Sequence, residues 1–89
     1  MTSVILDGVF AEFLSTRRLE RSAKDVRGLL EGLEEEFPTL RFRIRDETGE
    51  VRRYLKIFVN GAEIRTLKGQ ATKLGGHDTV DILHSIQGG

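Results

Sequence analysis

Residues 55–64 read Leu-Lys-Ile-Phe-Val-Asn-Gly-Ala-Glu-Ile, and this stretch decides how the chain folds. Every second residue from Leu55 to Val59 is apolar, which is the period-two pattern of a strand with one buried face. Phe58 falls on the opposite face. Asn60 and Gly61 follow at once, and both tolerate the positive φ that a two-residue hairpin requires. The stretch therefore predicts a strand, a tight turn and a short returning segment.

A helix is predicted upstream of this hairpin. Apolar residues recur at i, i+3, i+4, i+7 and i+11 from Val26 to Phe37, which forms one continuous stripe on a helix. Ser22 and Asp25 have the spacing of a capping box at its start. Pro38 ends the helix, because proline disfavours helical geometry at the residue before it.

Four other segments are predicted to be strands. Ser3–Phe10 is mostly apolar and β-prone, and a short connection to Arg17–Arg21 indicates an N-terminal hairpin. Leu40–Arg45 alternates apolar residues with arginine and is followed by a turn at 46–49, whereas Val80–His84 forms the last strand. One helix cannot cover both faces of a sheet, so we expect an α+β fold in which a mixed sheet packs on one main helix.

The composition limits the classes of function. A chain of 89 residues forms one domain with a thin core, which leaves little room for an internal catalytic pocket. Fourteen basic residues balance fourteen acidic ones, so no global charge attracts nucleic acid or an anionic membrane. There is no cysteine, which excludes disulfides and thiol catalysis, and the apolar run Val4–Leu6 is too short for a signal peptide or a membrane span. We expect a cytoplasmic protein.

Several polar groups are candidates for functional sites. The arginines could form a nucleic-acid footprint, but in Leu40–Arg45 they occupy the polar side of an alternating strand, which favours a solvated face. The acidic run Glu34–Glu36 is interpreted as a solvated face or as a contact for a basic partner. His77 and His84 lack metal-site spacing. No set of residues for nucleophilic or acid–base catalysis is present, so we expect no enzyme activity of its own.

The last two residues in the sequence, Gly88 and Gly89, have a chemical use. A tail without β-carbons is thin and can adopt any backbone conformation, so it can enter a narrow channel of another protein. A terminal carboxylate can attack the α-phosphate of ATP to give an acyl-adenylate, and a sulfur donor can then displace AMP to leave a thiocarboxylate. The alternative is a frayed end with no role.

Several segments resemble the MoaD/ThiS family of ubiquitin-like β-grasp sulfur carriers. The resemblance covers nearly the whole chain and is strongest from Lys56 onward. It rests on residues 57–65, Leu74, Asp78, Val80, Ile82 and Gly88–Gly89, together with residues 34–40 at the helix end and Phe10–Ala11 at the expected end of the first strand. The chain departs from the family pattern in two respects. Many relatives carry prolines where this chain has His84 and Ser85, and many have a glycine where it has His77.

The resemblance implies a ubiquitin-like β-grasp domain over residues 1–86 and a flexible tail over residues 87–89. It implies a sulfur carrier whose Gly89, next to Gly88, is adenylated by an E1-like enzyme that uses ATP, so that the carrier itself binds no cofactor or metal. The further partners are a sulfur donor of the rhodanese or cysteine desulfurase type and an acceptor synthase in cofactor, amino-acid or tRNA thiolation. No nucleic acid or membrane partner is implied.

Three alternatives stay open at this point. The chain could be the small subunit of a molybdopterin synthase, a ubiquitin-like modifier conjugated through Gly89, or a non-catalytic β-grasp interaction module. In each case the partner-binding candidates are Phe58 and Tyr54 on the exposed sheet face and Ile86 and Gln87 in the tail. An exposed aromatic residue is costly in water unless a partner covers it, and Phe58 is therefore the expected anchor.

Overall fold

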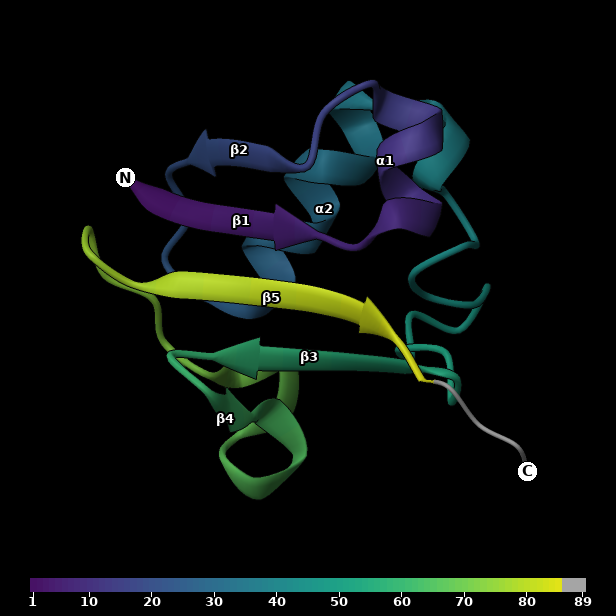
Figure 1. Cartoon of the computed structure of the whole chain (residues 1–89). Coiled ribbons are helices and arrows are strands. Elements are labelled where there is room, and N and C mark those ends of the chain that lie inside the picture. Colours follow the sequence, from purple (N-terminus) through teal and green to yellow (C-terminus); the bar gives the residue numbers. More distant parts are fainter. Residues whose placement is uncertain (86–89) are drawn as a thin grey trace.

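The computed structural model describes residues 1–85, except for the side chain of Phe13. In this part of the chain five strands form one mixed sheet in the order β2-β1-β5-β3-β4 (Figure 1). The strands are β1 (Thr2–Leu6), β2 (Arg18–Arg21), β3 (Leu55–Val59), β4 (Ala62–Glu63) and β5 (Thr79–His84). The helices are α1 (Gly8–Leu14) and α2 (Val26–Glu36), with short 3-10 turns η1 (Pro38–Leu40), η2 (Ile64–Thr66) and η3 (Gly69–Ala71).

Strand β5 lies at the centre of the sheet. It runs parallel to β1, with Val4 opposite Val80, and antiparallel to β3, with Ile57 opposite Ile82. Strands β1 and β5 are parallel, and the chain begins at the start of β1. The C-terminal end of β5 therefore lies at the opposite end of the sheet from the N-terminus, measured along the strands (Figure 1). His84, the last residue of β5, therefore lies between the neighbouring strands β1 and β3 at that end of the sheet.

The predicted helix is confirmed, but its start is three residues later than the capping box suggested. The N-cap is Asp25, whose carboxylate accepts a hydrogen bond from the backbone N–H of Gly28 at 2.8 Å. An aspartate satisfies an unpaired amide at a helix start as well as serine does. The predicted end is correct, since Phe37 caps α2 and Pro38 begins η1. The helix therefore presents the predicted stripe, in which Val26, Leu29, Leu30 and Leu33 are buried.

The N-terminal prediction was wrong in one respect, because the first strand ends at Leu6 and α1 follows. Asp7 is the N-cap of α1, and Phe10, which was assigned to the strand, is a buried core residue of this helix. The spacing of four residues between Phe10 and Leu14 is the helical signal that the β-prone start concealed. Strand β2 is confirmed, with Leu19 packed against the core.

The strand predicted at Leu40–Arg45 is also absent. Leu40 ends η1, and Phe42 adopts a positive φ of 66°, which strand geometry does not permit. The side chain of Phe42 is consequently 54% exposed, whereas Leu40 and Ile44 are buried. The guanidinium of Arg52 donates two hydrogen bonds to the Phe42 carbonyl, at 3.0 and 2.7 Å, and so holds this conformation.

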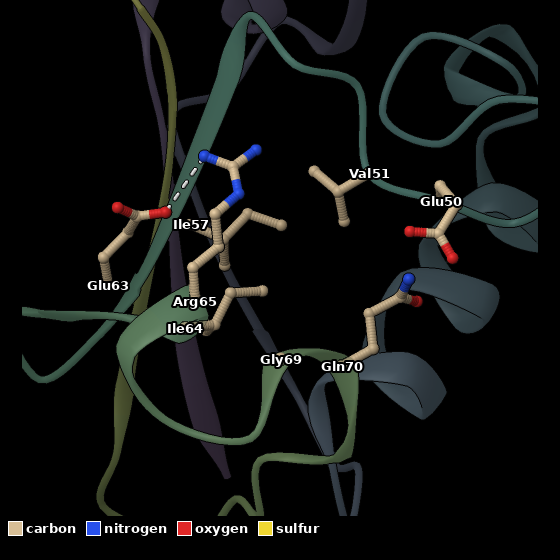
Figure 2. Close-up of a pocket in the computed structure, with 8 residues that line it drawn as sticks. All are labelled: Glu50, Val51, Ile57, Glu63, Ile64, Arg65, Gly69 and Gln70. Atoms are coloured by element: carbon tan, nitrogen blue, oxygen red, sulfur yellow. Dashed lines mark hydrogen bonds and ion pairs between the residues drawn. The ribbon is translucent and has the colours of Figure 1, made fainter.

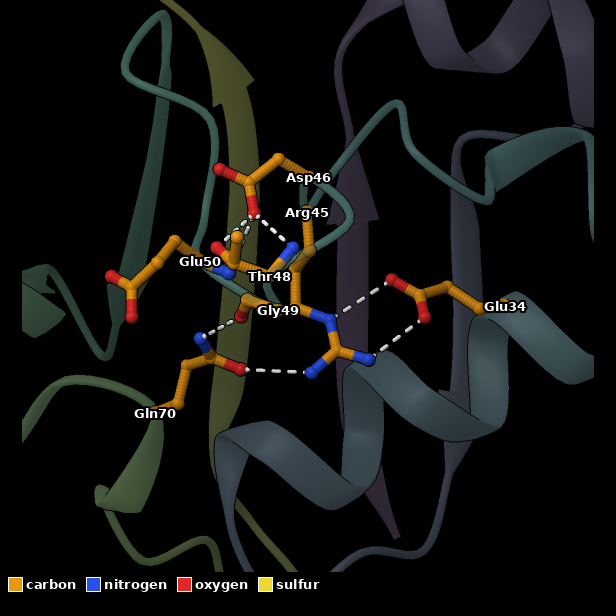
Figure 3. A network of polar contacts seen from close by, with 7 residues as sticks. All are labelled: Glu34, Arg45, Asp46, Thr48, Gly49, Glu50 and Gln70. Carbon is orange, nitrogen blue, oxygen red and sulfur yellow. Dashed lines mark hydrogen bonds and ion pairs between the residues drawn. The ribbon is translucent and has the colours of Figure 1, made fainter.

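The arginines and the acidic run are not simply solvated. Arg45 donates to both carboxylate oxygens of Glu34, at 3.0 and 2.8 Å, and also to Gln70 at 3.2 Å (Figure 3). Gln70 in turn donates to the carbonyl of Gly49, so the contacts connect α2, η3 and the predicted 46–49 turn. Glu36 also forms an ion pair, with Arg21 at 2.6 Å. Two of the three acidic side chains in the run therefore form ion pairs within the domain.

The hairpin is confirmed. Asn60 and Gly61 have φ values of 51° and 87°, and Val59 pairs with Ala62 across the turn. The alternation in β3 is also correct, since Leu55, Ile57 and Val59 are all buried. These three residues share one core cluster with α2 and with Phe10 of α1, so both helices pack on the same face, here called the inner face. No helix among residues 1–85 is long and apolar enough to cross a membrane.

Candidate functional site

Four predicted site residues, Ile86, Gln87, Gly88 and Gly89, lie outside the described residues. The structure does describe the point at which the tail begins. We call this point the tail root and define it as His84 and Ser85 with the residues that hold them.

The backbone of the tail root is held from both sides of β5. The His84 N–H donates to Asp7 Oδ2 at 2.6 Å, and the Ser85 N–H donates to the Tyr54 carbonyl at 2.6 Å. Asp7 directly follows β1 and Tyr54 directly precedes β3, the two neighbours of β5 in the sheet. The last two amides before Ile86 therefore each have a partner on an adjacent element.

The side chains at the tail root form a second set of contacts. His84 Nδ1 lies 2.9 Å from Asp7 Oδ2, and the two side chains are 26% and 20% exposed. The His84 ring lies 4.6 Å from the Phe10 ring and 6.0 Å from the Tyr54 ring, centroid to centroid, and is nearly parallel to the latter. The histidine therefore joins the polar pair to an aromatic cluster that extends from the core to the surface.

The Asp7 carboxylate is polarised by these donors. Burial alone would raise the pKa of Asp7, but the hydrogen bonds from the His84 backbone and ring and from the Phe10 amide outweigh it. The net pKa of Asp7 is lowered from its usual value. Asp7 is therefore held as a carboxylate that accepts bonds from both β5 and α1.

The outer face of the sheet, opposite the helices, carries Phe58 as predicted, but the expected exposure was wrong. Phe58 is half-buried, and across the sheet it stands opposite Asp81 of β5 and Glu63 of β4. Tyr54, predicted on the same sheet face, instead lies just before β3, where its 47% exposed side chain stacks on the His84 ring of the tail root. The two aromatic residues therefore differ in place, since Phe58 lies within the sheet and Tyr54 beside the root.

Two apolar residues of the outer face were missed at the sequence level. Ile5 of β1 is opposite Asp81 and is half-buried, and Leu83 of β5 is opposite Lys56 and is 36% exposed. Both could have been found from the sequence, because each alternates with the buried residues of its own strand. Ile5, Leu83 and Phe58 therefore form an apolar group on the outer face, in which Asp81 stands between Ile5 and Phe58.

A small pocket lies away from the tail root, between β3, η2 and η3 (Figure 2). Its apolar wall is formed by Val51, Ile57 and Ile64, and Arg65 is paired with Glu63 at 3.1 Å. The residues that line it include no nucleophile with an adjacent base. Nor do residues 1–85 contain a group of three or more metal-ligating side chains.

The comparisons with known proteins agree with this architecture. The structure is similar to the small archaeal modifier protein 1 (SAMP1) of Methanosarcina acetivorans, with 31% identity, a TM-score of 0.86, and coverage of 99% of this chain and 95% of that one. CysO in the Amycolatopsis orientalis BexX/CysO complex has 19% identity and a TM-score of 0.89 over the full length of both chains. Mycobacterium tuberculosis CysO has 21% identity and a TM-score of 0.88, over 97% of this chain and all of that one. No curated protein sequence matches significantly.

The mixed sheet that packs on one main helix is a ubiquitin-like β-grasp fold, as these neighbours also have. The model of the ThiS family matches residues 4–89, and the chain belongs to this family. Members are generally carriers rather than catalysts, and membership supports a role as a sulfur carrier or a protein modifier. It also implies interaction with activating and partner enzymes.

Proposed function

We propose that the chain carries sulfur as a thiocarboxylate on Gly89, after activation by an E1-like adenylating enzyme. The observation that carries the proposal is the ThiS family match, which extends over residues 4–89 and so includes both terminal glycines.

The proposed chemistry balances without an oxidant. A carboxylate oxygen of Gly89 attacks the α-phosphorus of ATP, the bond to the β-phosphate oxygen breaks, and pyrophosphate leaves. A sulfur nucleophile at the oxidation level of hydrosulfide then adds to the acyl carbon, and AMP leaves. The result is a thiocarboxylate. A rhodanese or a cysteine desulfurase would instead supply the sulfur as a persulfide. Its outer sulfur then adds to the acyl carbon with loss of AMP, and a thiol cleaves the resulting acyl disulfide, which leaves the thiocarboxylate and a new disulfide. An acceptor synthase in cofactor, amino-acid or tRNA thiolation would receive the sulfur.

The outer face supports docking of the activating enzyme. Apolar residues on a sheet face that neither α1 nor α2 covers are suited to contact with another protein. Tyr54 adds an exposed aromatic side chain close to the tail root, and aromatic residues are frequent interface anchors. Phe58 and Tyr54 would thus bind the enzyme while the tail residues Ile86 and Gln87 follow the glycines toward its active site.

Intact-mass spectrometry tests the proposal. The untagged chain is incubated with ATP, an E1-like enzyme from its own organism and a sulfide source, and the expected product carries one sulfur in place of one oxygen. Deletion of Gly89, or a non-cleavable tag after it, should abolish loading while the fold persists. If the tagged chain is loaded as well as the untagged one, without loss of the tag, the terminal carboxylate is not the site.

A second function, protein modification through Gly89, is favoured by one observation. The 31% identical structure is that of a small archaeal modifier protein. This function uses the same adenylate but transfers the acyl group to a lysine amine. Lysine-linked conjugates in cells that express the wild type, absent with the Gly89 deletion, would support it. Co-purification with a larger synthase subunit would instead indicate a molybdopterin synthase subunit.

A further inference from the structure

We propose that Asp7 and His84 are positioning residues that fix the direction in which the C-terminal tail leaves the sheet, and so favour its entry into the activating enzyme. This inference rests on the proposed function. It concerns residues of the domain rather than the glycines.

The length of the tail makes its starting direction important. Gly89, whose carboxylate is the reacting group in the proposed function, is four positions after Ser85 in the sequence. An extended chain spans at most about 3.5 Å per residue, so the terminal carboxylate can lie no more than about 14 Å from the root. With so short a reach, a change in the angle of the first peptides displaces the end of the tail by a large part of its length. A fixed root therefore limits the positions that the end of the tail can occupy before binding. This lowers the conformational entropy that is lost when the tail binds the enzyme.

Asp7 is the residue that fixes the root from the β1 side. Its Oδ2 accepts from the His84 N–H at 2.6 Å and lies 2.9 Å from His84 Nδ1, while its Oδ1 accepts from the Phe10 N–H at 3.3 Å. One carboxylate therefore joins the start of α1 to the last residue of β5. Because Phe10 is buried in the core, this anchor is itself held firmly.

His84 occupies a position where the strand pattern calls for an apolar side chain. It is in line with Val80 and Ile82, which are fully buried on the inner face. Its ring contacts Phe10 and Tyr54, and its Nδ1 requires a polar partner, which Asp7 provides. On the β3 side the Tyr54 carbonyl holds the next amide, that of Ser85. The root is thus restrained at two successive peptides and at one ring.

The chain offers a matched control at the other end of β5. Asp78 directly precedes this strand, and its carboxylate accepts from the Gly75 N–H at 2.6 Å and from Asn60 Nδ2 at 2.9 Å. Asp7→Ala and Asp78→Ala therefore each remove a carboxylate that holds a backbone amide at 2.6 Å, at opposite ends of the same strand. Only the first change affects the tail root.

The test measures ATP–pyrophosphate exchange by the activating enzyme against carrier concentration, well below the melting temperature of every variant. Asp7→Ala should raise KM about tenfold, the equivalent of one hydrogen bond to a charged group, with little change in kcat. Asp78→Ala should leave KM unchanged. Asp7→Asn should restore most of the loss, because its amide oxygen can still accept from the His84 N–H. His84→Phe keeps the ring contacts and should raise KM by a smaller factor.

Amide hydrogen exchange gives a readout that needs no enzyme. The His84 and Ser85 amides should exchange faster in Asp7→Ala and should be unaffected in Asp78→Ala. If Asp7→Ala and His84→Phe both load with the KM of the wild type, the positioning role is refuted. Unchanged exchange at His84 and Ser85 in Asp7→Ala refutes the anchor itself. If the wild type is not adenylated at all, the proposed function fails, and the loading role fails with it.

Discussion

The two faces of the sheet are built from alternate residues of the same strands, yet their side chains have different surroundings. On the inner face, Val4, Ile57, Val80 and Ile82 are at most 1% exposed and share one core with both helices. On the outer face the residues next to them in sequence are partly exposed and mix apolar with charged side chains. In the middle of this face Asp81 stands between Ile5 of β1 and Phe58 of β3.

Alternate residues of the same strand therefore serve different purposes: those on the inner face stabilise the fold, and those on the outer face are available for recognition. Burial of apolar area stabilises the fold, and the inner face provides most of it in this thin domain. The outer face is covered by neither helix, so its apolar residues contribute less to folding and are available to a partner. Substitutions on adjacent residues should therefore have effects of different kinds.

The largest expected effect is at Ile57. Its side chain is 1% exposed, and Ile57→Ala should lower the free energy of unfolding by about 3 kcal/mol through lost burial and a residual cavity. Chemical denaturation measures the change. Residual folded protein should still bind the activating enzyme with unchanged affinity. A loss below about 1 kcal/mol would contradict the view that the inner face provides the stability.

The next effect is at Phe58, one residue further along β3. Because Phe58 is half-buried, Phe58→Ala should cost about 1–2 kcal/mol of unfolding free energy, less than Ile57→Ala. The affinity for the activating enzyme should fall by about 1–3 kcal/mol, measured by titration calorimetry on the folded variant. A stability loss as large as that of Ile57→Ala, or unchanged affinity in a folded variant, would remove Phe58 from the docking surface.

The same contrast explains which parts of the structure the sequence could predict. The β3–β4 hairpin was correct because alternation and the Asn60–Gly61 turn are both local signals and agree with each other. Segment 40–45 has the same alternation, but its conformation depends on the distant Arg52, which holds the Phe42 carbonyl. The apolar stripe of α2 was predicted correctly because it, too, is a local signal. Local periodicity therefore fails where a remote side chain fixes the backbone.

The candidate site shows the same limit. A last strand through Val80, Ile82 and His84 was predicted, and the structure confirms it. The contact of His84 with Asp7 could not be predicted, because the two residues are 77 positions apart and Asp7 and the start of α1 were assigned to the first strand. The exposed side chain of Tyr54 at the tail root likewise depends on how β3 pairs with β5.

A smaller effect, dependent on pH, is expected where the inner face ends in the Asp7–His84 pair. The pKa of Asp7 is lowered in the folded chain, because hydrogen bonds from His84 and Phe10 outweigh the opposing effect of burial. Its contribution to stability is therefore present above the usual carboxyl range and is lost as the pH falls through the folded pKa. Asp7→Asn should be less stable than the wild type at neutral pH, and the difference should shrink on acidification.

Urea unfolding of the wild type and Asp7→Asn across this pH range measures the difference. The pKa values of Asp46 and Asp78 are also lowered, mainly by hydrogen bonds from Thr48 and Asn60 respectively, so both proteins keep their own acid sensitivity. For this reason the quantity to follow is the gap between the two curves. A gap that stays constant from neutral pH into the acid range would show that Asp7 has no coupled titration.

The smallest effect on stability is expected at Leu83, and it gives the clearest separation of the two faces. Leu83 is 36% exposed on the outer face, so Leu83→Ser should change the free energy of unfolding by no more than about 0.5 kcal/mol. Affinity for the activating enzyme should nevertheless fall, because a partner that covers Phe58 reaches the same face. Leu67→Ser is the matched control, since Leu67 is 44% exposed but lies after η2, outside the strands. Equal loss of affinity in both variants would mean that general surface hydrophobicity, and not the outer face, governs binding.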